Sequence, residues 1–441
     1  MQRDMIVGSG LEGQKFAILG LGRSGLATAE SLRASKAEAV LWDDKAEKRA
    51  EAERAGFTLA DLSQIDLKGF QALVLSPGIP HTLPAPHPIA QRFKDAQIPI
   101  IGDIELLFRA CPKAVYIGIT GTNGKSTTTA LIGHILKQAG RTVQVGGNLG
   151  IPVLSLEPLD ETGIYVLELS SYQLELIEHN LINIAVLLNL TPDHLDRHGD
   201  MAGYIAAKSR IISDTAPQVL IIGNEEVETR AVAIEARKKK NLRVKDIIVD
   251  CIPPLVDPSE LPTLPGQHNL QNAYAAYLTC RALDVPRDLI IQGLQSFPGL
   301  AHRQQLVGEI KGVRFINDSK ATNADAASKA LACYDNIYWI IGGQPKEGGL
   351  KGLEEFAPRI RHAFLIGQAS EEFASWCEGK MPYTLCGTLD VAVNKAAELA
   401  WSEKNPDAVV LLSPACASWD QFKNFEERGA KFTELIAQLN C

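Results

Sequence analysis

One stretch, residues 115–140, constrains the fold of this chain more than any other. It reads VYIGITGTNGKSTTTALIGHILKQAG: an apolar run of strand length, a Gly-rich turn, and a helical pattern that ends at Gly140. Backbone N–H groups of such a turn point at phosphate oxygens, and the helix N-terminus adds positive potential. Lys125 can reach the β and γ phosphates, and Ser126 is placed to bind Mg²⁺. We therefore expect a strand, a turn and a helix that bind ATP or GTP.

The match to the motif G-x-x-x-x-G-K-[ST] is incomplete. Ile119 stands where the first glycine belongs, with Gly118 and Gly121 on either side. The alternative interpretation is a loop whose glycines and lysine are incidental. The strand before the turn and the helix after it favour phosphate binding.

A second Gly-rich turn lies near the start of the chain, in FAILGLGRSGLATAESL, residues 16–32. Gly20, Gly22 and Gly25 match G-x-G-x-x-G, whose glycines allow a tight turn, close approach of the backbone to a diphosphate, and helix packing. Asp43 and Asp44 end the next apolar run, roughly where an acidic residue meets a ribose hydroxyl. Taken alone, this turn fits a nicotinamide cofactor as well as any other nucleotide diphosphate.

Strand-length apolar runs alternate with helix-length amphipathic segments along the whole chain, which indicates α/β architecture with mostly parallel sheets. With 441 residues, about three domains are expected. The Pro-rich segment at 76–93 cannot be one continuous helix, so we expect a loop or hinge there. The expected buried strands are FAILG, AVLW and ALVLSPG in the first part and VRFIND, NIYWIIGG, HAFLIG and AVVLLSP in the last.

Composition excludes several classes of partner. The chain has 44 basic and 52 acidic residues, a net charge of -8, so neither nucleic acid nor a membrane is an expected partner. The eight cysteines show no C-x-x-C spacing, which indicates neither a zinc site nor a disulfide framework and fits a reducing cytoplasm. No apolar run approaches the roughly 20 residues that a membrane span needs, and the N-terminus lacks the apolar core of a signal peptide.

Three further stretches carry candidate residues for phosphate chemistry. YVLELSSYQLE places Glu168 at the end of an expected buried strand, and LLNLTPDHLDRH does the same for His194. A carboxylate and an imidazole after adjacent strands, on the side of the phosphate turn, could bind ions that bridge a triphosphate and a substrate. Each also has an ordinary interpretation: Glu168 as an edge carboxylate and His194 as a neighbour of a helix cap.

The third stretch, GYIAAKSRII, has a helical pattern around Lys208. Tyr204, Ile205, Ile211 and Ile212 lie three or four residues away, so Lys208 falls on the apolar face of the helix. Desolvation lowers the pKa of a lysine and leaves more free amine, which can react with carbon dioxide. The alternative is a lysine whose charged end reaches water.

Together with GTNGKS, GGNLG, GQHNLQN, HR and NDSKATN in this order, these stretches resemble the Mur ligase family over residues 15–440. The resemblance implies a Rossmann-like N-terminal domain, a central P-loop ATPase domain and a Rossmann-like C-terminal domain, at 1–103, 104–300 and 301–441. It also implies ATP and Mg²⁺, with the metal held by Ser126, Glu168, His194 and a carbamate on Lys208. The implied catalytic residues are Lys125, Asn148, Glu168, His194 and Lys208.

Within the family, the last part of the chain resembles the member that adds D-glutamate to UDP-N-acetylmuramoyl-L-alanine through an acyl phosphate, a cytoplasmic step of peptidoglycan precursor synthesis. The stretches INDSKATN and LLSPACASWDQFKNFEERG carry this likeness. For Lys320 and Ser418, the alternative roles are a solvated lysine and a helix cap. Gln344 and Pro345 replace the Asp-Gly expected before Lys346, which leaves the geometry of this loop open. The implied D-glutamate residues are Lys320, Thr322, Lys346, Ser418 and Phe425.

The resemblance assigns the first glycine-rich turn to the diphosphate of a UDP-sugar rather than to nicotinamide. The implied residues for the UDP-substrate are Gly22, Arg23, Ser24, Asp43, Asp44, Lys45, Gly78, Asn148 and Ser170. Those for ATP are Gly121, Thr122, Asn123, Gly124, Lys125, Ser126, Thr127, Asn269, Asn272, Arg303 and Asp318. We expect a monomer whose partners are these small molecules. The alternatives are another Mur ligase, a folylpolyglutamate synthase-like ligase with a different acceptor, a P-loop switch without ligase chemistry, and a dehydrogenase.

Overall fold

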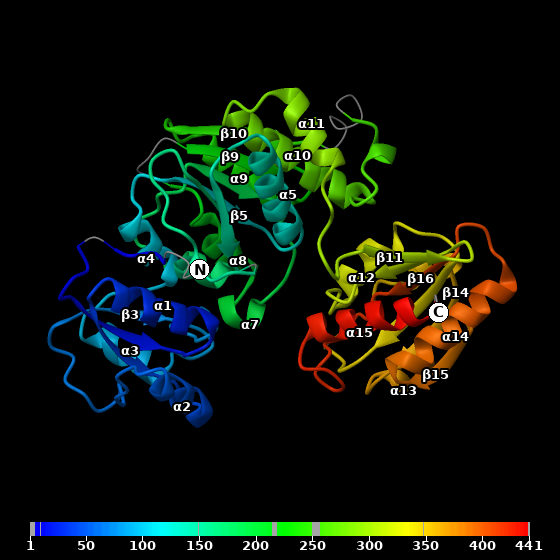
Figure 1. Ribbon diagram of the computed structural model, residues 1–441, viewed down its shortest axis with the longest axis horizontal. Coiled ribbons are helices and arrows are strands. Elements are labelled where there is room, and N and C mark those ends of the chain that lie inside the picture. The colour runs from blue at the N-terminus through cyan, green and yellow to red at the C-terminus, as the bar shows by residue number, and fades with distance from the viewer. Residues whose placement is uncertain are drawn as a thin grey trace. The chain divides into compact units, whose positions relative to one another are not determined.

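The computed structural model describes residues 5–8, 10–148, 150–213, 218–248, 256–346 and 348–439. The chain forms two compact units, Met1–Leu255 with Gln271–Leu294, and Val256–Leu270 with Gln295–Cys441. Three sheets follow one another along the chain, two in the first unit and one in the second (Figure 1). Their order agrees with three expected domains, while the boundaries at 103 and 300 stay a prediction.

The first sheet is parallel, with the strand order β2-β1-β3-β4. The three strands expected here are present, and the sequence pattern missed the fourth because it is only two residues long. The Pro-rich segment is a loop until His87, which caps a short helix, so the prediction of no continuous helix is confirmed. The elements are β1 Lys15–Leu19, α1 Arg23–Ala34, β2 Glu38–Trp42, α2 Ala46–Arg54, β3 Phe70–Leu75, α3 Pro88–Asp95, β4 Ile100–Ile101 and α4 Asp103–Ala110.

The second sheet is also parallel, with the order β10-β9-β8-β5-β7-β6. Its central strand β5, Val115–Thr120, leads through the phosphate turn into α5, Lys125–Gln138. Gly140, two residues past the helix, has a φ of 74°, so the expected end of the helix near this glycine is confirmed. The other strands are β6 Val143–Gly147, β7 Ile164–Glu168, β8 Ile184–Leu187, β9 Gln218–Gly223 and β10 Leu242–Ile247.

The helices after β7 and β8 are short and bring polar side chains to the same end of the sheet as the phosphate turn. They are α6 Ser171–Glu175, α7 Leu195–His198 and α8 Met201–Ser209, and the later helices are α9 Val227–Ala236, α10 Gln267–Ala282 and α11 Arg287–Gln295. The strand order reverses around β5. An open α/β sheet binds its ligands at such a point, outside the carboxyl ends of the strands.

The third sheet, β11-β12-β16-β13-β14-β15, is parallel except for β11, which pairs antiparallel to β12. The four predicted strands are present. The two edge strands were missed because they are half-exposed and interrupt their apolar residues with polar ones. The strands are β11 Gln305–Ile310, β12 Val313–Asn317, β13 Ile337–Gly342, β14 Ile360–Ile366, β15 Tyr383–Gly387 and β16 Val409–Leu412.

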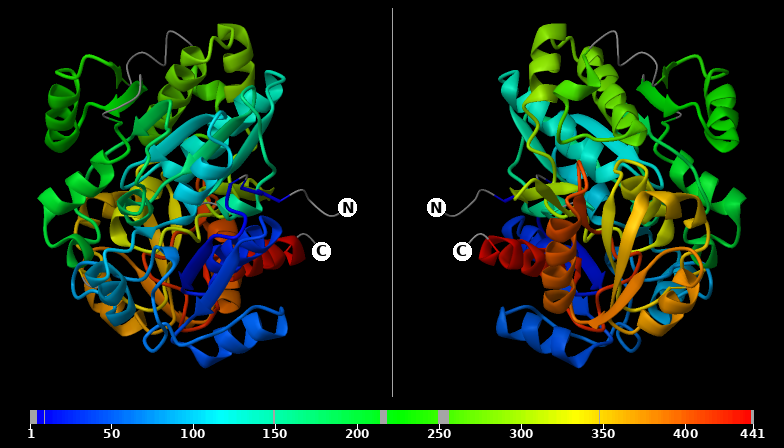
Figure 2. Two further views of the ribbon diagram at one scale, coloured as in Figure 1. Left: turned by 90° about the vertical axis from the view of Figure 1, so that its left-hand side faces the viewer. Right: turned by 90° about the vertical axis from the view of Figure 1, so that its right-hand side faces the viewer.

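Helices cover both faces of this third sheet. α14, Leu389–Glu403, and α15, Phe425–Gln438, lie side by side in Figures 1 and 2 and bury one face. α12, Ala324–Leu331, and α13, Ser370–Cys377, bury the other. Alternate residues of a strand therefore enter two separate cores, with Tyr338 on one side and Trp339 on the other. Among the described residues, no helix is both long and apolar enough to cross a membrane.

The packing of the first glycine-rich turn generates a prediction about stability. A Cβ on Gly25 would lie 1.9 Å from the carbonyl oxygen of Gly20, whereas a Cβ on Gly22 in the same turn would meet nothing within 4 Å. Gly25→Ala should therefore lower the free energy of unfolding by roughly 2 kcal/mol. Gly22→Ala should change it by less than about 1 kcal/mol. Urea denaturation of the two variants measures the difference, and equal effects would contradict this account of the turn.

Candidate functional site

The phosphate turn, residues 121–124 between β5 and α5, has a backbone conformation that requires its glycines. Gly121 has a φ of 149° and Gly124 a φ of 82°, which residues with a Cβ adopt only under strain. The Asn189 side chain accepts from the N–H of Asn123 at 2.8 Å, and the Asn189 carbonyl accepts from the N–H of Thr122 at 3.0 Å. The turn is thus anchored to the loop after β8.

Lys125 folds back over this turn. Its ammonium donates to the carbonyl of Gly121 at 2.9 Å and to the carbonyl of Thr122 at 2.7 Å. Ser126, the next residue, is buried in the first turn of α5. The positive charge therefore sits at the N-terminus of α5, where a phosphate is favoured.

A cavity of about 410 Å³ opens beside the phosphate turn, within the first unit. It brings together eight predicted site residues from both sheets of that unit: Arg23, Ser24, Gly78, Lys125, Asn148, Ser170, His194 and Lys208. The cavity is also lined by residues that sequence analysis missed, which are Pro77, Asp103, Gly147, Gly150, Pro152, Ser171, Tyr172, Gln173, Asp193 and Tyr204. Four of these, Pro77, Gly147, Ser171 and Asp193, directly adjoin a predicted residue in sequence, which was the available signal. Asp103 had none, since it begins a helix far from any motif.

Glu168 and Asn148 form a bonded pair next to this cavity. The Asn148 amide donates to Glu168 Oε1 at 2.7 Å, and its backbone N–H donates to the Glu168 carbonyl at 2.9 Å. The other carboxylate oxygen, Oε2, is buried, and no group in the described parts of the chain donates to it. An anionic oxygen without a donor suits a cation.

The position of His194 differs from the sequence prediction. It does not end a strand, because β8 stops at Leu187 and His194 lies beyond a loop, directly before α7, with a φ of 53°. The two strands are not adjacent either, since β7 and β8 pair on opposite sides of β5. The prediction was wrong because the crossover order of a sheet cannot be read from the strand patterns. His194 still lines the cavity, with Nε2 3.4 Å from Asp193 Oδ2.

Lys208 lies on the buried face of α8, with 2% of its surface exposed. Its ammonium donates to the Gly121 carbonyl at 2.9 Å and to Thr120 Oγ1 at 3.4 Å, and it lies 4.8 Å from the ring centre of Tyr204. The alternative, a charged end that reaches water, is therefore wrong. Burial, followed by the charge of Lys125, lowers the pKa of Lys208 to about 6. Much of the amine is neutral at pH 7.

Four of the residues expected to bind the UDP-substrate do not line the cavity. Asp43 binds the first glycine-rich turn itself, accepting from the N–H of Leu21 at 2.6 Å and of Lys45 at 2.9 Å. Asp44 is exposed and lies 2.9 Å from His87 Nε2. Asp43, Asp44, Lys45 and Gly22 are absent from the lining, so their contact with a substrate stays a prediction.

The residues expected around adenine and ribose fall in both units. Asn272 belongs to the first unit and accepts from Thr128 of α5 at 3.1 Å. Asn269, Arg303 and Asp318 belong to the second. Asp318 is buried, accepts from Ser413 Oγ at 2.8 Å and from the N–H of Gln304 at 3.2 Å, and burial raises its pKa to about 7.

The predicted amino-acid residues occupy loops of the second unit. The Lys320 ammonium lies 3.9 Å from the ring centre of Phe425, the first residue of α15. Ser418 is buried, whereas Lys346 is exposed. The loops of these two residues are joined between Gln344 and Ala417, whose backbones exchange hydrogen bonds of 2.9 and 3.2 Å.

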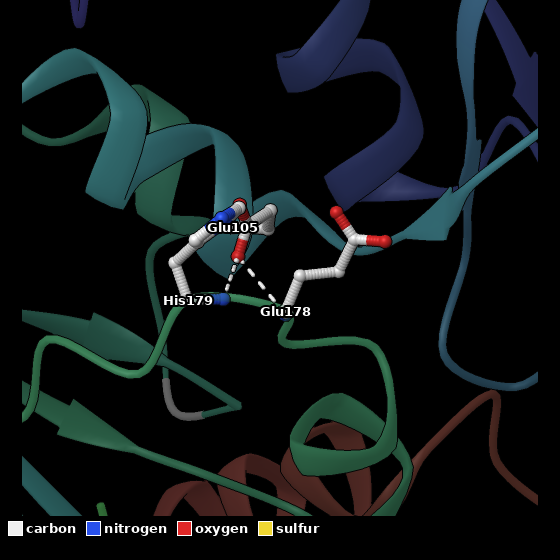
Figure 3. Close-up of side chains that lie close together, drawn as sticks. All are labelled: Glu105, Glu178 and His179. Atoms are coloured by element: carbon white, nitrogen blue, oxygen red, sulfur yellow. Dashed lines mark hydrogen bonds and ion pairs between the residues drawn. The ribbon is translucent and has the colours of Figure 1, made fainter. Parts of the chain in front are cut away.

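Glu105, Glu178 and His179 form a cluster with the residue types of a metal site (Figure 3). Hydrogen bonds within the protein, however, occupy the carboxylate of Glu105. Glu105 Oε1 accepts from Arg109 at 2.8 Å and lies 2.7 Å from His179 Nδ1. Its Oε2 accepts from the N–H groups of Glu178 and His179 at 3.0 and 2.9 Å. Burial alone would raise the pKa of Glu105, but these bonds hold it below the usual value. The carboxylate is fully used in joining α4 to the loop after α6.

The cysteines agree with the expectation of no disulfide framework among the described residues, where all six are free. Cys251 and Cys441 lie outside the described residues.

The fold and this cavity define a class of protein: a P-loop α/β protein in which a second glycine-rich turn, preceding α1, contributes to the same cavity. Comparison with known proteins gives the family. Residues 119–247 match the Mur ligase middle domain, and residues 302–416 match the Mur ligase, glutamate ligase domain.

Two relatives are similar over nearly their whole length. The UDP-N-acetylmuramoylalanine–D-glutamate ligase of Paramagnetospirillum magneticum is 49% identical, with 97% of each chain covered. That of Rhodospirillum rubrum is 50% identical, with 97% of this chain and 95% of the relative covered. The solved structure of the UDP-N-acetylmuramate-alanine ligase from Thermotoga maritima shares the fold, with a TM-score of 0.56, 16% identity, and 96% and 99% of the two chains covered. The chain belongs to the Mur ligase family.

The bonds of Glu105 predict a structural rather than a metal-binding role. Glu105→Ala leaves two backbone N–H groups and the Nε–H of Arg109 without their acceptor, so it should lower the free energy of unfolding by about 2–3 kcal/mol. Glu178→Ala, a control whose side chain is 40% exposed, should cost less than about 1 kcal/mol. Thermal unfolding with and without added Mg²⁺ or Zn²⁺ measures both effects. A wild-type stabilisation by metal that Glu105→Ala removes would contradict the structural role.

Proposed function

We propose that this protein is an ATP-dependent ligase that adds D-glutamate to UDP-N-acetylmuramoyl-L-alanine. The observation that carries the proposal is its identity of about half, over nearly the full length, to relatives named for this activity. The cavity supports it, because residues of the first glycine-rich turn, Arg23 and Ser24, line the same space as the P-loop residue Lys125. A UDP-linked substrate and a triphosphate would thus meet at one place.

The reaction needs activation because a carboxylate does not acylate an amine in water. A terminal carboxylate oxygen of UDP-N-acetylmuramoyl-L-alanine attacks the γ-phosphorus of ATP, the bond to the β-phosphate oxygen breaks, and ADP leaves. The amine of D-glutamate then attacks the acyl-phosphate carbonyl, phosphate leaves, and the nitrogen loses a proton. Both steps bring anions together, so cationic side chains must surround the reacting groups.

The side chains of the cavity suit these steps. Lys125 provides a charge for the β and γ phosphates at the N-terminus of α5. Asn148 lines the cavity, and its hydrogen bond to Glu168 orients its side-chain amide. The amide can therefore hold the reacting carboxylate in position. In the second unit, Lys320, Thr322, Lys346, Ser418 and Phe425 are proposed for D-glutamate, and Asn269, Arg303 and Asp318 for adenine and ribose.

Mg²⁺ is expected because the family uses ATP, and the residues present fit it. Ser126, Glu168, His194 and Lys208 would hold the metal, and the donor-free Oε2 of Glu168 is the feature of this structure that suits a cation. When bound, Mg²⁺ neutralises charge on the phosphates. Lys208 fits a carbamate, because its buried, largely neutral amine is the form that reacts with carbon dioxide.

The remaining expectations stay part of this proposal: a monomer that acts in the cytoplasm on small molecules. A folylpolyglutamate synthase-like activity has fold similarity alone in its support. The solved structure of E. coli FolC matches with a TM-score of 0.52 and 19% identity, with 75% of this chain and 90% of that chain covered. No observation favours a P-loop switch or a dehydrogenase.

A coupled assay of ADP release tests the proposed reaction. ADP should appear only when ATP, UDP-N-acetylmuramoyl-L-alanine and D-glutamate are all present, and L-alanine and diamino acids should be poor acceptors. Lys125→Ala should release no ADP above background, because no other side chain of the turn carries a charge to the phosphates. Efficient ligation of L-alanine or a diamino acid would assign the protein to another branch of the family.

Lys208→Ala tests the carbamate. The variant should be nearly inactive, and acetate or formate should partly restore activity by occupying the vacated oxygen positions. Lys125→Ala is the matched control, since it removes a neighbouring lysine from the same cavity and short carboxylates should not restore its activity. Mass spectrometry of the intact wild type should show one added carbon dioxide. Full activity of Lys208→Ala without added acid would refute the proposal.

A further inference from the structure

A buried arginine lies beneath the proposed D-glutamate site. Arg428 of α15 is 1% exposed, and its guanidinium contacts two loops. Nε donates to Ser319 Oγ at 3.0 Å, and one terminal nitrogen donates to the Ser319 carbonyl at 2.8 Å. Both terminal nitrogens donate to the Cys416 carbonyl at 3.2 Å. Every one of these acceptors is a neutral oxygen.

The guanidinium is therefore a buried charge without a carboxylate partner at ion-pair distance among the described residues. Burial lowers the pKa of Arg428 to about 10, with the charges of Asp420 and Asp318 acting in the opposite sense, so it stays charged at neutral pH. Burying a charge without a partner is costly, and an apolar residue of similar volume would stabilise a core better. A role beyond packing would explain why this site holds an arginine.

The two loops bound by Arg428 carry proposed substrate residues. Ser319 directly precedes Lys320, and Cys416 lies two residues before Ser418. The Ser319 hydroxyl also donates to the carbonyl of Phe425 at 2.8 Å, which ties the first loop to the start of α15. Small movements of the guanidinium would thus displace Lys320 and Ser418.

A third loop reaches the same point. A Cβ on Gly343 would lie 3.3 Å from a terminal nitrogen of Arg428 and 2.4 Å from the Ala417 carbonyl, so the glycine allows this loop to pass close to both. Its φ of 133° also suits a glycine. This loop continues through Gln344, which pairs with Ala417, to Lys346. All three loops with proposed D-glutamate residues therefore meet at one guanidinium.

We propose that Arg428 is a positioning residue for the amino-acid acceptor, which fixes the three loops and adds a buried positive charge that favours a dicarboxylate. The inference rests on the proposed function. Arg428 does not touch the acceptor in this scheme. It acts through Lys320, Ser418 and Lys346, and through its charge, which is screened little in the protein interior.

Two substitutions separate geometry from charge. Arg428→Lys keeps the charge but loses the planar fork that reaches three oxygens, and Arg428→Met keeps much of the volume but loses the charge. Both should raise the KM for D-glutamate about tenfold or more, as expected for loss of charged hydrogen bonds, while the KM values for ATP and the UDP-substrate stay within about twofold. The preference for D-glutamate over D-glutamine should fall in Arg428→Met and be largely kept in Arg428→Lys.

Arg359→Lys is the matched control, because Arg359 also donates to a backbone carbonyl, that of Ala332 at 2.9 Å, but is half-exposed and bonds to Ala332 and Tyr334 rather than to these loops. It should leave all three KM values unchanged. If the Arg428 variants fail to fold, Ser319→Ala tests the same junction by removing one acceptor; it should raise the KM for D-glutamate about threefold and leave that for ATP unchanged.

The outcomes are distinct. An unchanged KM for D-glutamate in a folded Arg428 variant, or in Ser319→Ala, would overturn the inference, and so would an equal rise in all three KM values, which a purely structural role predicts. If the wild type itself does not use D-glutamate, the proposed function fails first. If the wild type uses D-glutamate and the variants behave like it, the inference alone fails.

Discussion

The turn between β5 and α5 is the element on which the rest of the cavity depends. Two of its glycines adopt a positive φ, and its carbonyls accept hydrogen bonds from the ammonium groups of both Lys125 and Lys208. Asn189, from the loop after β8, fixes the turn from the other side. A few hydrogen bonds thus hold two lysines and a neighbouring loop against this turn.

Charged groups of both signs, two lysines and a glutamate, lie near this turn. Burial, and after it the charge of Lys125, lowers the pKa of Lys208. A buried carboxylate oxygen of Glu168 has no donor among the described residues. In the proposed function, phosphates would lie against the lysines and a divalent ion against this oxygen.

The second unit also contains a buried charged side chain, that of Arg428. There the buried charge of Arg428 is bonded to neutral oxygens of Ser319 and Cys416, and it joins loops rather than reaching a ligand. Lys320 is held against the ring of Phe425, a contact that keeps a flexible side chain in place. Both features order the loops that carry the proposed D-glutamate residues.

The sequence by itself determined the local features of this protein: the two glycine-rich turns, the alternation of strands and helices, and the burial of Lys208. These follow from backbone freedom at glycine and from the spacing of apolar residues, which act over a few positions. Tertiary structure alone decided that β7 and β8 flank β5, that His194 reaches the cavity from a loop, that Asp103 and Ser171 line it, and that Arg428 joins three loops. Strand order and the meeting of distant loops depend on how whole elements pack, and no local pattern of residues encodes that packing.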